Sequence, residues 1–227
     1  MKKIINQLFQ LYKGSQCLVD TAIPNSYLFW YLLDKVLCMI YGRLLFFSRS
    51  VCFIHHTSII KCKRLLLFGS SMNIDRNCYI DALSVDGIKF GKNVSVGKYT
   101  VIECTGSLQH LGKGFKVGNN VGLGTKGHYG CAGGIEIGDD TIIGNYVSFH
   151  SENHNFSDLD KPIRLQGVNH KGIYIGKNCW IGAKVTILDG AKVGNGCVIA
   201  AGSVVINCFP DNCVIGGIPA KILKYRV

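Results

Sequence analysis

The sequence predicts a mainly β domain, built as a coil of short strands that repeat every six residues, with a helical extension before it. Three observations carry this prediction. Glycine is abundant, at 28 of 227 residues, and a small or apolar residue follows each member of a periodic aliphatic row. A period of six differs from the 3.6 of a helix and from the alternation of a simple strand, so it indicates short strands separated by turns. The aliphatic row keeps its spacing without a miss over Ile175, Ile181, Ile187, Val193, Ile199 and Val205.

Residues 1–57 form the extension, which differs from the rest of the chain in charge and hydropathy. Residues 1–66 hold nine Lys or Arg against two Asp, which is +7 of the chain's net charge of +11. The stretch from Tyr27 to Ile54 is strongly apolar, and its aliphatic residues recur three or four apart. This spacing predicts one or two amphipathic helices.

Two placements are open for this helical extension. Asp34 and Lys35 lie near the middle of the first apolar run, and each would cost about 2.5–3.5 kcal/mol at the centre of a bilayer. The sequence therefore favours a helix in the headgroup region of the inner leaflet, with residues 1–54 making peripheral membrane contact. The alternative is a helix that packs against the coil or against a neighbouring subunit.

The coil itself is predicted over residues 58–227. Upstream of the regular row, the spacing of six holds from Phe90 through Val96, Ile102 and Leu108, and its phase then slips. Such slips indicate residues looped out of a coil, because the aliphatic rows must stay aligned inside. The two largest breaks fall at residues 125–134 and 150–172. We expect excursions there, and loops on a rigid scaffold are where sites are usually built.

The cysteines indicate a reducing compartment. Eleven are present, none forms a CxxC pair, and no secretory signal peptide with a cleavage site is evident. We therefore predict free thiols packed as small hydrophobic groups and a cytoplasmic protein. Cys179 and Cys197 lie eighteen residues apart, so they stack in one inward row if a coil takes three hexapeptides.

Two segments near the C-terminus resemble the left-handed β-helix acyltransferases. These are Ile175–Lys184, which reads IGKNCWIGAK, and Gly217–Lys221, which reads GIPAK. Cys131–Asp140 followed by Ser151–Asp158 resembles more specifically the branch that O-acetylates bacterial surface polysaccharides such as colanic acid and O-antigen. The resemblance covers roughly residues 58–227. It implies a left-handed parallel β-helix, a homotrimer with sites between subunits, and transfer of an acetyl group from acetyl-CoA to a sugar hydroxyl.

The resemblance implies that His154 is the general base that removes the proton of the acceptor hydroxyl. Imidazole suits this role because its ordinary pKa, about 6.5, leaves a neutral base at cytoplasmic pH. His150 is the second candidate for the base, and His128 is a candidate for contact with the acceptor. Glu152 and Asp158 are candidates either to orient His154 or to bind sugar hydroxyls, and the sequence does not separate these two roles.

The turn Cys131–Gly134 has a functional and a structural interpretation. Its backbone N–H groups could stabilise the oxyanion of the reaction, or the glycines could simply form a tight corner, which the sequence favours. An acyl-cysteine intermediate at Cys131 is disfavoured, because no base is placed beside this thiol and the resembled enzymes do not form one.

For coenzyme A, the resemblance implies that the pantetheine arm lies beside the small residues Ala183 and Ala201. It also places Lys221 and Lys224 where related enzymes have cations for the phosphates of the coenzyme. Since lysine is a flexible point charge, we expect the groove to supply most of the selectivity. The alternative for both lysines is a solvated basic tail.

Two other function classes stay open. A metal-dependent hydratase of the γ-class carbonic anhydrase type needs three His ligands around zinc, and His128, His150 and His154 do not follow that spacing; we expect no metal. A non-catalytic structural coil is the other alternative. Nucleic-acid binding is not supported, because the basic residues lack interleaved aromatic residues. The sequence leaves open the acceptor sugar and its hydroxyl, the length of the acyl group, and whether the acceptor is lipid-linked.

Overall fold

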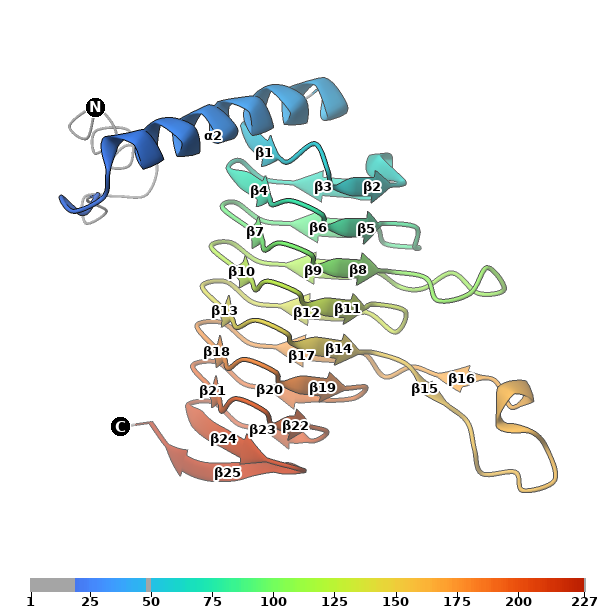
Figure 1. Ribbon diagram of the computed structural model, residues 1–227. Helices are drawn as coiled ribbons and strands as arrows, with labels where there is room; N and C mark the ends of the chain where they lie inside the picture. The colour runs from blue at the N-terminus through green and yellow to red at the C-terminus, as the bar shows by residue number, and fades with distance from the viewer. Residues whose placement is uncertain (1–18, 48–49, 227) are drawn as a thin grey trace.

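The computed structural model describes residues 19–47 and 50–226, and most of them form a straight rod of three parallel sheets with one helix lying across its end (Figure 1). The predictions for residues 1–18 lie outside the described part. Sheet A has nine strands: β1 (Cys52–Ile54), β4 (Met72–Ile74), β7 (Ser95–Val96), β10 (Gly122–Leu123), β13 (Ile142–Ile143), β18 (Trp180–Ile181), β21 (Val198–Ile199), β24 (Cys213–Gly217) and β25 (Ala220–Tyr225).

Sheets B and C have seven strands each. Sheet B holds β2 (Ile59–Lys61), β5 (Tyr79–Asp81), β8 (Val101–Glu103), β11 (His128–Gly130), β14 (Ser148–His150), β19 (Thr186–Leu188) and β22 (Val204–Val205). Sheet C holds β3 (Leu66–Phe68), β6 (Ile88–Phe90), β9 (Phe115–Val117), β12 (Ile135–Ile137), β17 (Ile173–Ile175), β20 (Lys192–Val193) and β23 (Cys208–Phe209). Short 3-10 turns occupy Lys63–Leu65 and Ile163–Leu165.

The chain visits sheets A, B and C in turn, and one circuit makes one coil of the rod. Strands of successive coils pair in parallel, as in Ile135↔Ile173 and Ile137↔Ile175. This stacking places every sixth side chain inside. The six aliphatic residues of the predicted row are each at most 1% exposed, which confirms that this row faces the interior of the coil.

Free cysteines and aromatic rings fill several other inward positions. Cys179 and Cys197 are both buried as free thiols, as predicted, and burial raises the pKa of Cys179 to about 11. Four rings contact one another in the interior with centroids 5.9, 5.4 and 5.0 Å apart, the first pair edge to face and the other two stacked: Phe90, Phe115, Tyr129 and Phe149. The rod therefore has a continuous core.

The excursions from the rod differ in part from the prediction. Residues 125–134 are not looped out, because they contain β11, which pairs in register with β8 and β14. Their inward positions hold Tyr129 and Cys131 in place of aliphatic residues, and this substitution hid the repeat. The excursion in this region instead spans residues 105–111, where Leu108 is 88% exposed although it keeps the spacing of six. The predicted excursion over residues 150–172 is observed.

The N-terminal extension contains one described helix, α2 (Asn25–Phe46), which covers the open end of the first coil. The rod begins at Cys52, so the predicted boundary at residue 58 is six residues late. Gly42 lies against Cys52, and a Cβ at Gly42 would stand 2.9 Å from the Cys52 Sγ, so glycine permits this close contact. Among the described residues, α2 is not long and apolar enough to cross a membrane.

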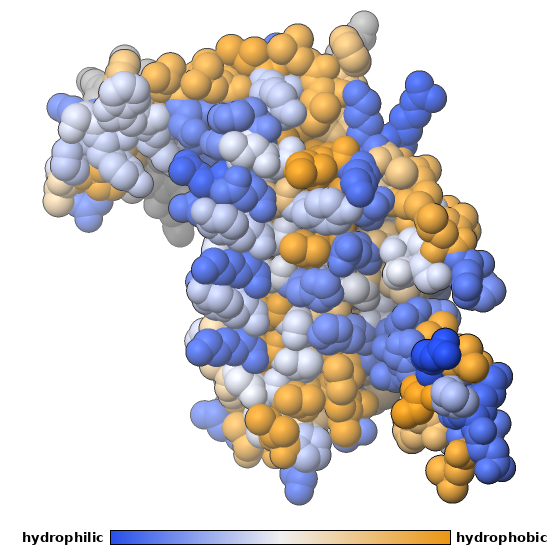
Figure 2. Space-filling view, turned by 45° about the vertical axis from the view of Figure 1, so that its right-hand side comes forward, coloured by the Kyte–Doolittle hydropathy of each residue, from blue (hydrophilic) through white to orange (hydrophobic). Residues whose placement is uncertain are grey.

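The outer side of α2 is apolar as well. Apolar residues are therefore spread around the helix more evenly than in the predicted amphipathic helix. Figure 2 shows hydrophobic side chains along the upper edge of the molecule, over α2. A helix that only caps a coil needs one apolar side, because terminal elements of repeat proteins present a polar outer surface. Side chains at least 45% exposed on α2 include Tyr27, Phe29, Trp30, Val36, Leu37, Ile40 and Leu44.

Candidate active site

The excursion over residues 151–172, which we call the arm, leaves the rod after β14 at the corner between sheets B and C. Ser151 is fully buried at this exit; its hydroxyl donates to the carbonyl of Gly130 at 2.8 Å and accepts from the N–H of Gly133 at 2.9 Å. The arm then begins as a strand pair in which β15 (Asn153–His154) runs antiparallel to β16 (Val168–Asn169). His154 is therefore held on a strand at the base of the arm.

Asp189 fastens the two ends of this strand pair to the rod. Its carboxylate is buried at the end of β19 and accepts hydrogen bonds from the N–H groups of Lys171 and Gly172 at 2.8–2.9 Å, where the arm returns. The side-chain amide of Asn153, next to His154, donates to the same carboxylate at 3.5 Å. Sequence reasoning missed Asp189, because an aspartate before a glycine is typical of any turn.

The ring of His154 is exposed and makes no hydrogen bond with any described residue, so both ring nitrogens are available. Glu152, two residues earlier, instead faces His170, with 3.5 Å between its Oε2 and the His170 Nδ1. Asp158 lies farther along the arm, where its carboxylate accepts from the N–H of Asp160 at 3.0 Å. Within one chain, neither carboxylate forms a hydrogen bond with His154.

His128 and His150 lie on the outer surface of sheet B, on the neighbouring strands β11 and β14. Their ring centroids are 5.6 Å apart. Burial lowers the pKa of His150, and the proximity of His128 lowers it further. The two rings therefore lie side by side on the wall next to the base of the arm, where their nitrogens face outward.

Two of the residues proposed for coenzyme A, Ala183 and Ala201, lie at another corner, between sheets A and B, whereas Lys221 and Lys224 lie on β25 of sheet A. The N–H of Gly202 donates to the carbonyl of Ala183 at 2.9 Å, which places Ala183 and Ala201 on adjacent coils, and both are exposed. Lys221 pairs with Gly216 in the next coil, and Lys224 pairs with Val214. Along the chain, this corner comes before each strand of sheet B, whereas the arm leaves after a strand of sheet B. One chain therefore does not bring the small residues and His154 together.

The turn Cys131–Gly134 is a structural corner. The N–H of Gly133 is bound by Ser151 and that of Gly134 by the Cys131 carbonyl at 3.0 Å, so neither is free to bind an oxyanion. Cys131 is fully buried, its thiol lies 3.3 Å from the Tyr129 carbonyl, and burial raises its pKa well above the usual value. A buried thiol with a raised pKa is a poor nucleophile. These positions give no support to an acyl-cysteine mechanism.

The arrangement of histidines differs from a three-histidine metal site. Among residues 19–47 and 50–226, no group of three or more His, Cys, Asp or Glu is placed to hold a metal ion. His128 and His150 are close to each other, while the arm carries His154 away from their wall. Within one chain, the geometry gives no support to the zinc hydratase alternative.

The amino-acid sequence is similar to those of known transferases. The model of the bacterial transferase hexapeptide family (six repeats) matches residues 172–207. A protein of Escherichia coli K12 named as the lipopolysaccharide biosynthesis O-acetyl transferase WbbJ is 34% identical over 65% of this chain and 75% of its own length. A protein of Mycobacterium tuberculosis named as an acetyltransferase is 33% identical over 61% of this chain, but the match spans only 44% of that longer protein.

A solved structure shares the fold. AntD, an N-acyltransferase from Bacillus cereus in complex with dTDP and 3-hydroxybutyryl-CoA, superposes with a TM-score of 0.55 at 19% identity, over 83% of this chain and 87% of that one. Together with the repeat, the three parallel sheets and the family match, this similarity confirms the predicted left-handed parallel β-helix.

Proposed function

Because this chain belongs to the bacterial hexapeptide transferase family, we propose that it transfers an acetyl group from acetyl-CoA to a sugar hydroxyl in the biosynthesis of a bacterial surface polysaccharide. The observation that carries this proposal is the position of His154, on a strand pair fixed to the rod at both ends, with a ring that no described residue occupies. The name of the Escherichia coli relative, a lipopolysaccharide biosynthesis O-acetyl transferase, supports a glycan as the acceptor.

The proposed reaction needs one proton transfer and one acyl transfer. Neutral His154 accepts the proton of the sugar hydroxyl while the hydroxyl oxygen attacks the thioester carbonyl. The carbon–sulfur bond then breaks, and the proton passes from His154 to the departing thiolate of coenzyme A. A positioned general base of this kind typically contributes about 10²–10⁴-fold to the rate. The neighbouring rings of His128 and His150 would bind hydroxyls of the acceptor on the adjacent wall.

A second copy of the chain would complete the site, and we propose a homotrimer. The corner with Ala183 and Ala201 and the arm with His154 lie on opposite sides of sheet B, so a neighbouring copy could bring one to the other. The arm supports this assembly, because no described residue of its own chain covers its apolar tip. Exposed there are Phe156 (72%), Leu159 (96%), Ile163 (55%) and Leu165 (50%).

We also propose that the enzyme works in the cytoplasm, at the inner face of the membrane, with the outer side of α2 in the headgroup region. Ten large apolar side chains between Tyr27 and Phe47 are at least 38% exposed, and three of them are Tyr27, Trp30 and Tyr31, the residue types that favour a membrane interface. Exposed Arg43 and Arg64 add positive charge at this end of the rod, which anionic lipids attract. In a trimer with parallel rods, three such helices would face one plane.

The experiment that tests the function incubates purified protein with acetyl-CoA and a panel of sugars, nucleotide sugars and short surface glycans. Acetyl transfer is measured as release of the coenzyme A thiol and as a mass gain of the glycan by one acetyl group. The expected result is transfer by the native chain that is lost in His154→Ala. Calorimetry with acetyl-CoA on the same samples separates the alternatives: no binding and no transfer would support a non-catalytic coil instead.

A further inference from the structure

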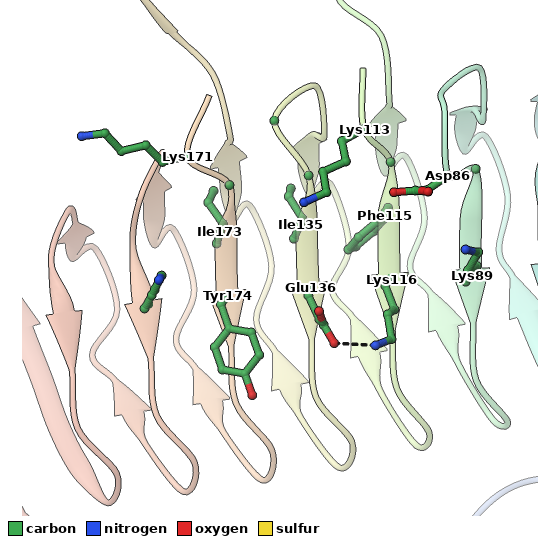
Figure 3. A pocket seen from close by; sticks show the side chains of 16 residues that line it. Asp86, Lys89, Lys113, Phe115, Lys116, Ile135, Glu136, Lys171, Ile173 and Tyr174 are labelled. Atoms are coloured by element: carbon green, nitrogen blue, oxygen red, sulfur yellow. Dashed lines mark hydrogen bonds and ion pairs between the residues drawn. The ribbon is translucent and has the colours of Figure 1, made fainter. Parts of the chain in front are cut away.

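A hollow on the outer face of sheet C adjoins the base of the arm. It is a cavity of about 230 Å³ that spans five consecutive coils, and we call it the sheet C groove (Figure 3). Its floor is the outward row of β6, β9, β12, β17 and β20, and its rim is the corner between sheets B and C, where the arm is attached. Its charged and tyrosine side chains are Asp86, Lys89, Lys113, Lys116, Glu136, Lys171, Tyr174 and Lys192.

Glycines line the rim of this groove. One glycine precedes each of four successive strands of sheet C, and all four have positive φ: Gly87 (69°), Gly114 (129°), Gly134 (93°) and Gly172 (80°). Glycine adopts this conformation at little steric cost. A Cβ at Gly87 or Gly114 would also clash with the backbone of the preceding coil, so glycine allows neighbouring coils to approach closely along the rim.

The stems of two rim lysines lie against glycines of the following coil. The Cδ of Lys113 is 2.8 Å from the position that a Cβ on Gly134 would occupy, and the Cδ of Lys171 is 3.1 Å from the corresponding position on Gly190. Each lysine stem thus leans over the glycine of the following coil. In Figure 3, Lys113 reaches toward the strand that carries Ile135, in the middle of the groove, whereas Lys171 extends past one end.

The groove concentrates positive charge. Lys89 and Lys116 are in register on neighbouring strands, where like charges repel each other, and Glu136 relieves only one of them through an ion pair with Lys116 at 2.7 Å. Tyr174 and Lys192 continue the row. None of the ion pairs among the described residues involves Lys89, Lys113, Lys171 or Lys192. Five lysines against two carboxylates leave an excess positive charge in one cavity.

We propose that the sheet C groove binds the diphosphate of a glycosyl diphosphate, and so holds the anionic end of the acceptor. Lysine ammonium groups are common phosphate ligands. The cavity is smaller than the roughly 300–1,000 Å³ of a pocket for a whole small-molecule ligand, so it fits one part of the acceptor. The identity of the ligand rests on the proposed function, whereas the anion site itself does not.

The position of the groove suits such an acceptor. Lys171 and Gly172 belong both to its lining and to the return of the arm, where Asp189 binds their N–H groups. A sugar linked to a diphosphate in the groove would therefore project toward the base of the arm. Nucleotide sugars and lipid-linked sugars share this diphosphate, and the experiment below distinguishes the two sources.

The test is calorimetric titration of the full chain with inorganic pyrophosphate, with uridine diphosphate, and with a sugar diphosphate of a short-chain prenol. Lys113→Gln should weaken binding of all three by about fivefold to tenfold, as expected for the loss of one charged contact in an open groove. Lys92→Gln is the matched control, because it removes the same charge from an exposed corner outside the groove and should leave the affinity unchanged. Added salt should weaken binding to the native chain.

Glu136→Gln gives the opposite test. Removing this carboxylate frees Lys116 and should tighten pyrophosphate binding severalfold, which a merely structural role of Glu136 would not do. Tighter binding of uridine diphosphate than of pyrophosphate would indicate a nucleotide sugar, and tighter binding of the prenol diphosphate a lipid-linked sugar. No binding of any probe, equal losses in Lys113→Gln and Lys92→Gln, or unchanged affinity in Glu136→Gln would overturn the proposal.

Acetyl transfer, measured separately, keeps the two proposals apart. If the groove binds pyrophosphate as expected but no sugar is acetylated, the proposed function fails and the anion site stands. If sugars are acetylated and the ratio of kcat/KM for a phosphorylated to a neutral acceptor is the same in Lys113→Gln as in the native chain, the groove proposal fails and the function stands.

Discussion

The carboxylate of Asp189 binds the backbone N–H of Lys171 through both of its oxygens, at 2.9 Å each, and so closes the arm at the point where it rejoins the rod. The same carboxylate accepts a hydrogen bond from the side-chain amide of Asn153, next to His154. Asp189 is therefore a positioning residue: it holds the strand that carries the proposed base and does not touch the base itself.

Asp189→Ala should lower both stability and turnover. Unfolding should become easier by about 1–3 kcal/mol, because the partly buried N–H groups of Lys171 and Gly172 lose their acceptor. Since small displacements of a catalytic group cost up to about 10²-fold in rate, kcat should fall by about tenfold or more. Thermal unfolding and kcat at saturating acetyl-CoA measure the two effects.

Asp211→Ala is the matched control for Asp189. Asp211 also accepts a backbone hydrogen bond in a turn, from the N–H of Asn195 at 2.8 Å, but at a corner away from the arm. It should lower stability and leave kcat unchanged. A purely structural role of Asp189 would instead give the two variants the same kcat, and Asp189→Asn, which keeps one oxygen, should fall between Asp189→Ala and the native chain.

The fold followed from the sequence, whereas the location of the excursions followed only in part. The period identified the inward row because Ile175 and its successors are aliphatic without exception. It failed at residues 125–134, where the inward positions hold Tyr129 and Cys131, and at Leu108, which keeps the spacing by coincidence while it lies in a loop. The spacing of aliphatic residues does not locate inward positions that an aromatic ring or a thiol occupies.

The sequence predicted less of the candidate site than of the fold, because the site depends on contacts between coils. His154 stood out because a motif surrounds it. Asp189 lies 35 residues later and carries no motif, and its function depends on the coil bringing β19 beside β14. The sheet C groove likewise depends on stacking, since its lysines come from four separate coils. Contacts between coils are not encoded at any fixed spacing once excursions of unequal length intervene.

His154→Ala should lower kcat by about 10²–10⁴-fold, because the proton of the hydroxyl loses its acceptor. Affinity for acetyl-CoA, measured by calorimetry, should stay within about twofold, since Ala183 and Ala201 lie at another corner and Lys221 lies on sheet A. His170→Ala is the control from the same arm, where the ring pairs with Glu152. Activity of His154→Ala within tenfold of the native value would place the base elsewhere, and His150 would be tested next.

Stability should fall below about pH 6.5 in part because of His150. Burial lowers the folded-state pKa of this imidazole from 6.5, so at lower pH the unfolded chain binds a proton that the folded chain resists. The stabilisation is complete above pH 6.5 and is lost as the pH falls toward the folded pKa. His128 on β11 faces His150 and opposes its protonation, and Glu103 lies in the same row on β8.

The measurement compares thermal midpoints at pH 7.5 and 5.5. His150→Gln should show a smaller decrease than the native chain, and the exposed loop residue His110, changed to Gln, should show the native decrease. Some decrease persists in His150→Gln, because burial also lowers the pKa of His55. An identical decrease in His150→Gln and in the native chain would contradict this assignment.

Tyr129→Phe should stabilise the protein. The Tyr129 ring stacks between Phe115 and Phe149, and its buried hydroxyl has no hydrogen-bond partner among the described residues. A buried polar group without a partner costs about 1–3 kcal/mol, and the substitution removes it while it keeps the stacked ring. The melting temperature should therefore rise, by about 2–4 °C for each kcal/mol gained in a domain of this size. A lower melting temperature would mean that the hydroxyl is bound in solution.

The outer side of α2 gives the last prediction. Trp30, Leu37 and Leu44 recur every seven residues on one stripe and are 66%, 57% and 66% exposed, so they can be changed without disturbing the contact of Gly42 with β1. A truncation at residue 54 would be a poorer test, because it removes β1 as well as the helix. Leu37→Glu/Leu44→Glu should weaken binding to anionic vesicles by about tenfold or more, since two leucines lose their burial and each 1.4 kcal/mol is tenfold.

Val85→Glu/Leu111→Glu is the control for this pair. It places the same two charges at exposed apolar positions, 70% and 55%, that lie away from α2. Vesicle co-sedimentation of both variants, with their oligomeric state measured by light scattering, separates the two placements of the helix. If Leu37→Glu/Leu44→Glu dissociates the oligomer and leaves vesicle binding intact, α2 packs against a neighbouring subunit. If it releases an intact oligomer from vesicles, the outer side of α2 is the membrane contact.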